Sequence, residues 1–273
     1  MFLGISVDAW SSIFIGVLIL AGTITQGTIG FGLGTIATPI IALIRPELVP
    51  TLILLLALCI SSYTLARTYR ETSWRVVGIS SLARIPGSLV GAWAIASLSP
   101  DGLSIFIGCA VLFAMTLSSL GWSPRPTTVN TLIAGVVSGI LGTSTSIGGP
   151  PMALIMKRFA PNRTRGTLAG TFVLGTLISL IILTFNGQIS GTQVTTAAAY
   201  FPLVVIGLIA ANYLNRFIDR HLLNRIVITV AIAAALMLIV ESALFWPRTL
   251  PPQRKAPAGS SCETGQPLPC KHL

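Results

Sequence analysis

Two glycine-rich runs combine small residues with hydroxyl side chains, and these residue types suit the binding of an anion. The first run, GTITQGTIGFGLG, begins at Gly22, and the second, SGILGTSTSIGGPP, begins at Ser138. Glycine and proline lower helix propensity, so we expect a break in each run. A helix that starts after a break presents free N–H groups and the positive end of its dipole. Neither run contains a carboxylate, which favours an anion over a cation.

The candidate binding residues are Arg84 and the residues of the runs that offer N–H groups, hydroxyls, an amide or close approach to the backbone. From the runs they are Thr25, Gln26, Gly27, Gly30, Phe31, Gly32, Ser138, Gly139, Gly142, Thr143, Ser144, Thr145, Gly148, Gly149 and Pro150. A structural interpretation stays open, in which small residues allow close helix packing and hydroxyls bond carbonyls. The recurrence of the pattern in corresponding segments favours a binding site.

Arg84 is the charge that lies deepest in an apolar stretch. It follows Arg75 by nine residues and precedes Pro86 by two, which places it about 13 Å deep at the helical rise. A charge left in lipid costs at least about 2.5 kcal/mol, so we expect Arg84 to serve the anion site. The alternatives are a side chain that reaches the membrane surface or one that bonds carbonyls freed near Pro86.

The sequence gives little support to other chemistry. No Ser/His/Asp or Cys/His set, phosphate-binding loop or HExxH motif is present, so we predict that the protein is not an enzyme. Cys59 and Cys109 stand alone in apolar runs, and Cys262 and Cys270 have only His272 nearby, so we assign no metal and no cofactor. The seven acidic residues lie in loops, in tails or near segment ends, so we expect no mid-membrane carboxylate.

Eight apolar segments must position the candidate residues. Of 273 residues, 53% are hydrophobic and 9% charged, which is typical of an integral membrane protein. The net charge of +10 collects at segment ends and therefore indicates membrane orientation, not nucleic-acid binding. The segments are 11–43, 48–66, 76–98, 103–120, 131–156, 167–185, 195–214 and 222–245. The predicted fold is an all-α polytopic membrane protein.

The first and fifth segments, which hold the glycine-rich runs, must break or fold back. The first has 33 residues, and a straight helix of that length would measure about 50 Å against a hydrocarbon core of about 30 Å. Related spacings also suggest a duplicated four-segment unit. The matching pairs are Gly27 with Gly139 and Pro39 with Pro151 at an offset of 112, and Pro86 with Pro202 and Gly91 with Gly207 at an offset of 116. Few positions match, so chance stays an alternative.

The duplication predicts two membrane repeats, 1–120 and 121–246, followed by a disordered Pro-rich tail, 247–273. If all eight segments cross the membrane, each side receives eight basic residues. If the first and fifth are re-entrant hairpins, one side receives eleven and the other five, as the positive-inside rule requires. The hairpin version makes the repeats inverted and both termini extracytoplasmic. Eight crossings with broken helices is the alternative.

The two runs, extended as GTITQGTIGFGLGTIATPIIAL and GILGTSTSIGGPPMAL, together with the Arg-bearing loop before GTLAGTF, resemble the TauE/SafE or sulfite exporter family of membrane permeases. The likeness covers about residues 12–245 and leaves out the Cys-bearing tail. It implies a bacterial inner-membrane carrier for sulfite, sulfonates or related organic anions. The family's two signature stretches fall on Gln26, Gly27, Gly30, Phe31, Gly32 and Pro39, and on Gly139, Gly142, Gly148, Gly149, Pro150 and Pro151.

Residues and resemblance together predict a multi-pass permease that moves a small anion, such as a sulfur-containing oxyanion or an organosulfonate, by alternating access. Its expected partners are that anion and the lipid bilayer, with no nucleic acid, and the sequence indicates no oligomeric state. An anion channel and a non-transporting membrane scaffold or assembly factor are the alternatives.

Overall fold

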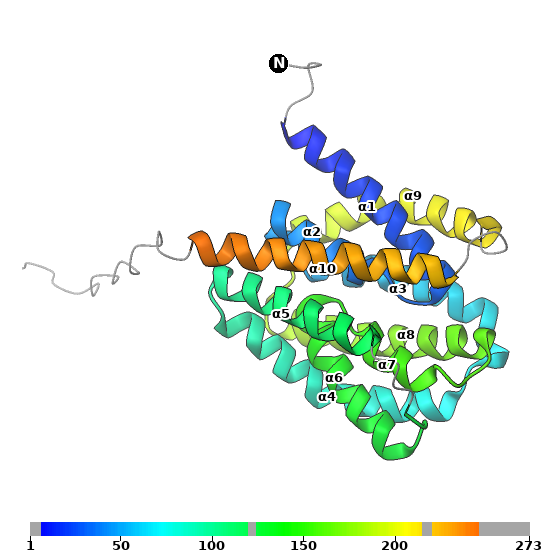
Figure 1. Ribbon diagram of the computed structural model, residues 1–273. Helices are drawn as coiled ribbons and strands as arrows, with labels where there is room; N and C mark the ends of the chain where they lie inside the picture. The colour runs from blue at the N-terminus through cyan, green and yellow to red at the C-terminus, as the bar shows by residue number, and fades with distance from the viewer. Residues whose placement is uncertain (1–6, 120–123, 215–219, 246–273) are drawn as a thin grey trace, which may run out of the picture.

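The computed structural model describes residues 7–119, 124–214 and 220–245, and over these residues it consists of helices and their links (Figure 1). The helices are α1 (Val7–Ile29), α2 (Leu33–Ile44), η1 (Pro46–Leu48), α3 (Thr51–Thr68), η2 (Tyr69–Glu71), α4 (Trp74–Ser97), α5 (Pro100–Ser119), α6 (Thr128–Thr145), α7 (Gly149–Met156), α8 (Pro161–Phe185), α9 (Gly191–Leu214) and α10 (Arg220–Phe245). Eight of these described helices are long and apolar enough to cross a membrane. The predicted all-α polytopic class is confirmed.

The two predicted breaks exist, but each is much shorter than the glycine-rich run that holds it. The first spans residues 30–32, between α1 and α2, and the second spans residues 146–148, between α6 and α7. Gly22 and Gly27 lie inside α1, and Pro39 lies inside α2. The predicted tail, with Cys262 and Cys270, lies outside the described residues.

The hydroxyl side chains of both runs are accommodated within the helices. Thr23 Oγ1 donates to the Ile19 carbonyl at 2.7 Å, and Thr145 Oγ1 donates to the Leu141 carbonyl at 2.7 Å. Thr25, Thr28 and Ser144 make the same bond to the carbonyl four residues earlier. These side chains satisfy their own polar groups within the helix and leave it intact.

Both breaks reverse the direction of the chain. A Cβ on Gly22 would lie 3.0 Å from the Cα of Leu33, so α2 folds back beside α1. Ser138 Oγ donates to the carbonyl of Gly148 at 2.7 Å, so α7 folds back beside α6. The structure therefore combines features of both predicted arrangements: α1 and α6 are long enough to span a membrane, and each is followed by a returning shorter helix.

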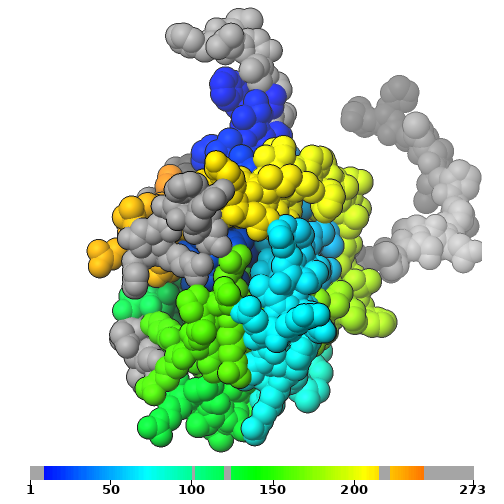
Figure 2. Space-filling view, turned by 90° about the vertical axis from the view of Figure 1, so that its right-hand side faces the viewer, coloured from blue at the N-terminus to red at the C-terminus, as the bar shows by residue number. Residues whose placement is uncertain are grey.

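Basic side chains gather at one end of the bundle, which we call the Arg-rich end and define by the η2 link and the link from α7 to α8. The backbone N–H of Ser73 donates to Thr167 Oγ1 at 3.0 Å, and this bond joins the starts of α4 and α8. At the opposite end, Gln193 Nε2 donates to the carbonyl of Glu47 at 2.7 Å. Figure 2 views the Arg-rich end, with the cyan α3 to α4 region beside the green start of α8 and the yellow α9 above. Its described basic side chains include Arg67, Arg70, Arg75, Lys157, Arg158, Arg163 and Arg165.

The helix packing pairs follow the pattern that an inverted duplication would produce. The last residues of α1 and α6 are 29 and 145, and the first residues of α2 and α7 are 33 and 149, so a single offset of 116 aligns both breaks. The offset of 112 that matched Gly27 with Gly139 does not align them. Helix α1 packs along α9 as α6 packs along α4, while α3 packs on α8 and α5 on α10. The duplication itself stays a prediction.

Candidate functional site

The two breaks lie against each other in the interior of the bundle. A Cβ on Gly34, in the first turn of α2, would overlap the carbonyl oxygen of Ser146. A Cβ on Gly149, at the start of α7, would lie 2.8 Å from the Cβ of Phe31. Glycine at position 34 therefore permits the two backbones to approach, and glycine at position 149 makes room for the Phe31 side chain.

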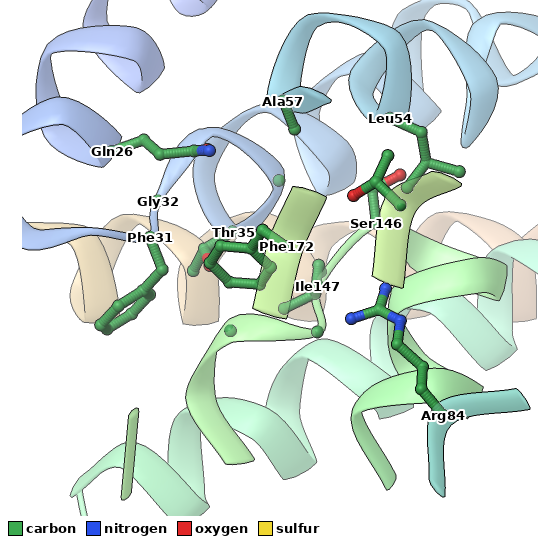
Figure 3. A pocket seen from close by; sticks show the side chains of 14 residues that line it. Gln26, Phe31, Gly32, Thr35, Leu54, Ala57, Arg84, Ser146, Ile147 and Phe172 are labelled. Carbon is green, nitrogen blue, oxygen red and sulfur yellow. The ribbon is translucent and has the colours of Figure 1, made fainter. Parts of the chain in front are cut away.

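A small cavity of about 20 Å³, room for roughly one water molecule, lies between the breaks (Figure 3). Residues of α3, α4 and α8 line its other sides. We call it the central cavity, and its lining residues are Gln26, Phe31, Gly32, Gly34, Thr35, Leu54, Ala57, Arg84, Ser146, Ile147, Gly148, Gly149, Phe172 and Thr176. Both breaks and both returning helices thus contribute to one site.

The N-terminus of α2 opens on this cavity. Its first helical hydrogen bond runs from the Ile36 N–H to the Gly32 carbonyl at 3.0 Å. The N–H groups of Leu33, Gly34 and Thr35 therefore precede the hydrogen-bonded part of the helix. No side chain caps this N-terminus. Such a terminus attracts negative charge through its N–H groups and its dipole.

The N-terminus of α7 lies opposite and is built differently. Pro150 and Pro151 occupy its first turn, where a missing N–H breaks no helical bond. Ser146, which ends α6 with φ of 60°, donates from Oγ to the carbonyl of Pro50 at 2.9 Å. Ser138 Oγ holds the carbonyl of Gly148. Side-chain bonds thus fix the second break in place.

Arg84 supplies a positive charge to the same cavity. It lies near the middle of α4 and is 1% exposed, so it does not reach the membrane surface. Its Nη1 donates to Ser138 Oγ at 3.1 Å, and its Nε has no hydrogen-bond partner. A Cβ on Gly142 would lie 3.0 Å from the Arg84 Cζ, and one on Gly175 would lie 2.6 Å from its Nε, so glycines make room for the guanidinium.

The charge of Arg84 is not balanced by any carboxylate that the structure describes nearby. Among the described side chains, Arg84 is the one charged group that is buried, and Glu47, Glu71 and Glu241 are all exposed. A buried cation without a counter-ion is costly, and a bound anion would offset that cost. Arg84 and the N–H groups of α2 together form an anion-accepting environment.

Six of the predicted site residues line the central cavity: Gln26, Phe31, Gly32, Arg84, Gly148 and Gly149. Ser138, Gly139 and Gly142 lie behind it and contact Arg84. The others lie away from the cavity. Thr25, Ser144 and Thr145 bond carbonyls of their own helices, Thr143 bonds Ser179 at 2.7 Å, Gly27 packs on Ala211, Gly30 faces Leu168, and Pro150 lines a neighbouring cavity.

Four residues of the central cavity come from α3 and α8, outside the glycine-rich runs, and the sequence did not predict them. Leu54 and Ala57 come from α3, and Phe172 and Thr176 come from α8. The spacing of four between Phe172 and Thr176 puts them on one helix face, but an apolar helix does not reveal which face meets a site. Thr35 lies in the first turn of α2 and Ser146 in the second break, so their position in the sequence was a signal that could have identified them.

Tyr200, the counterpart of Arg84 at an offset of 116, does not reach the cavity. Its hydroxyl donates to the carbonyl of Ser12 at 2.9 Å and joins α9 to α1. Arg165, at the start of α8, donates from Nη2 to the carbonyl of Gly27 near the end of α1. Arg165 therefore ties the first break to the Arg-rich end.

The family model described as Sulfite exporter TauE/SafE matches residues 14–238. The matched range contains both breaks, Arg84 and the whole lining of the central cavity. No curated protein and no solved structure matches the chain.

Proposed function

Since the chain belongs to the sulfite exporter TauE/SafE family, whose members are membrane transporters and not enzymes, we propose that it is a permease for a small sulfur-containing oxyanion or organosulfonate. The observation that carries the proposal is the meeting of Arg84 with the uncapped N-terminus of α2 in one buried cavity. A planar guanidinium with an unused N–H can donate to the oxygens of such anions, which are pyramidal or tetrahedral at sulfur.

Alternating access is the mechanism that the architecture supports. Each returning helix starts at the central cavity, and the two hairpins enter from opposite ends of the bundle. Rocking of one half against the other would then open the cavity to each end in turn. A channel would instead conduct without saturation, so saturable counterflow in proteoliposomes separates a carrier from a channel.

A thermal-stability screen of the purified protein tests the proposal directly. A ligand that binds the native state raises its stability in proportion to the logarithm of its concentration over Kd. We expect sulfite, thiosulfate or a sulfonate to raise Tm in the wild-type protein and not in an Arg84→Gln variant. Amines and sugars should leave Tm unchanged. A scaffold or assembly factor predicts no shift with any of these compounds, and a uniform absence of shifts would refute the proposal.

We further propose that the protein lies in a bacterial inner membrane with the Arg-rich end in the cytoplasm, as the positive-inside rule favours. Single cysteines at Asn162, near the Arg-rich end, and at exposed Asn186, near the other, report the orientation. In a background without native cysteines, an impermeant thiol reagent added to intact cells should label position 186 and spare position 162. The reverse pattern would contradict the orientation.

A further inference from the structure

One aromatic side chain, Phe31, lines two separate cavities. It lines the central cavity with Arg84, and it also lines a second cavity between α1, α7, α8 and α10. We call the second cavity the vestibule and define it by Ile29, Phe31, Ala153, Lys157, Arg165 and Leu168. Because the same ring borders both spaces, it is the partition between them at this point.

The vestibule lies at the Arg-rich end and carries positive charge. Lys157 follows α7 and is exposed, while Arg165 lies in the first turns of α8 and is partly buried. Glu71, the acidic residue of the nearby η2, does not line the vestibule; it lines a neighbouring cavity to which Arg165 and Arg67 also contribute. A cleft lined by cations raises the local concentration of anions, so the vestibule is suited to collect the charge type that Arg84 would bind.

The backbone on both sides of Phe31 adopts conformations that favour glycine. Gly30 has φ of 101° and Gly32 has φ of 147°, so Phe31 stands between two glycines in conformations that other residues adopt at a cost. The first break holds no other residue between α1 and α2. The Phe31 ring rests on Gly149, where a Cβ would lie 3.1 Å from its Cγ. Small rotations at the flanking glycines are thus able to lift the ring from its seat.

We propose that the vestibule is the path by which an anion passes between the Arg-rich end and the central cavity, and that the Phe31 ring is the gate on this path. The inference rests on the permease function proposed above and adds to it a route, a barrier and a preference for anions on that route. In the structure the ring is 8% exposed and lies between the spaces, which is the closed position of the gate.

Phe172 provides a matched control for the gate. It is also a phenylalanine of the central cavity, is 9% exposed and belongs to the same apolar cluster as Phe31. It does not line the vestibule, and it lies inside the regular helix α8. Its replacement by alanine deletes the same side-chain volume beside the central cavity, but it leaves the residue between the two cavities in place.

Thiol accessibility tests the gate without any transport measurement. In a protein whose native cysteines are replaced by serine, Thr35→Cys reports on the central cavity and Ala153→Cys reports on the vestibule. The probe is an anionic methanethiosulfonate carrying a sulfonate group, applied to purified protein in nanodiscs. We expect Phe31→Ala to speed modification of Cys at position 35 by at least about tenfold, as removal of a gating side chain should. Phe172→Ala should change this rate by less than about twofold, since it leaves the barrier in place.

Each other outcome contradicts the proposal. If Phe31→Ala leaves the rate at position 35 unchanged, the ring is not the barrier. If Phe31→Ala and Phe172→Ala speed it equally, the effect is general loosening of the cavity. The rate at position 153 should be the same in all backgrounds and serves as the reference. Should Phe31→Ala fail to fold, Phe31→Leu keeps an apolar side chain on Gly149 and should give a smaller increase in the same direction.

The charge preference of the vestibule has its own readout. Modification at position 153 by the anionic reagent should exceed that by a cationic methanethiosulfonate, and Lys157→Gln should reduce the ratio about threefold, as loss of one nearby charge predicts. An unchanged ratio of anionic to cationic modification would contradict a contribution of Lys157 to the charge preference of the vestibule. Because these rates need no substrate, a failure of the gate and a failure of the anion screen are distinguishable: the first leaves the proposed permease function intact, and the second does not change the measured accessibility of position 35.

Discussion

The two helix breaks occupy equivalent places in the fold but are stabilised by different means. At the equivalent positions 30 and 146 the backbone has positive φ, of 101° and 60°. The first break uses glycine, and two bonds reach the last turn of α1 from outside the hairpin: Arg165 donates to the Gly27 carbonyl, and Gln26 donates to Ser61 of α3. The second uses Ser146, whose hydroxyl bonds Pro50, and is braced by the bonds of Ser138 with Gly148 and Arg84.

This difference suggests a division of labour between two halves of similar topology. The second hairpin contacts the charged group, because Ser138 of α6 accepts a hydrogen bond from Arg84 of α4, so it is suited to bind. The first break carries an aromatic ring between two glycines at positive φ, so it is suited to the gating role proposed above. Alternating access needs both a fixed site and a moving barrier, and under the proposed function each break would supply one of them.

Loss of the buried charge should have the largest effect on the binding half. Arg84→Lys should weaken binding of the anion that most stabilises the wild-type protein by about tenfold, and Arg84→Gln by about a hundredfold. Lysine keeps a point charge but lacks the planar fork. Isothermal titration of the purified variants measures this order. Exposed Arg67 at the Arg-rich end is the control, and Arg67→Gln should leave affinity within twofold. Equal affinities in all variants would place the site elsewhere.

A substitution that forces the two breaks apart should have the next largest effect, a loss of folding stability. A Cβ on Gly34 would overlap the Ser146 carbonyl, so Gly34→Ala forces the hairpins apart and should cost about 2 kcal/mol of stability. Gly78→Ala, in α4, meets no atom within 4 Å and should be neutral or slightly stabilising. Thermal unfolding followed by circular dichroism compares the two variants. Equal stability would show that the contact between breaks is dispensable.

Removal of the brace between Arg84 and Gly148 should have a moderate effect. Ser138→Ala leaves the guanidinium and the Gly148 carbonyl with one partner fewer in a buried place, which should cost about 1–2 kcal/mol. Ser144→Ala, on the same helix, removes a hydroxyl that donates to its own helix at Ile140 and should cost less than about 0.5 kcal/mol. Unfolding midpoints and anion affinity should both fall for Ser138→Ala. A larger loss of stability for Ser144→Ala than for Ser138→Ala would contradict the assignment of Ser138 as the brace.

Stiffening of the moving half should have the smallest effect on stability and a selective effect on rate. Gly30→Ala and Gly187→Ala both place a side chain at positive φ, and each should cost about 1 kcal/mol. Gly187 follows α8 near the opposite end and has open space around it. We expect Gly30→Ala alone to slow anion flux in proteoliposomes while leaving affinity within about threefold. Similar flux in both variants would argue against a hinge at the first break.

The sequence predicted both breaks because glycine and proline cluster where an apolar segment is too long for one crossing. It overestimated their extent, since Gly22 and Gly27 lie inside α1, where they pack closely on Leu33 and Ala211, and the nearby hydroxyls bond within the helix. Side chains of adjacent residues also lie in different environments, which the sequence does not show. Gln26 lines the cavity and bonds Ser61 at 3.2 Å, whereas Thr25 bonds its own helix.

The sequence by itself determined the number of long apolar segments, the two segments that break, and Arg84 as a charge that must be buried or bound. These properties follow from composition along the chain, because lipid imposes one length and one polarity on each crossing. Only the tertiary structure decided that the two breaks touch, that Phe31 lies between two cavities and that α3 and α8 complete the site. The rotation of each helix about its axis is set by packing against its neighbours, and an apolar helix in lipid carries little periodic pattern to reveal it.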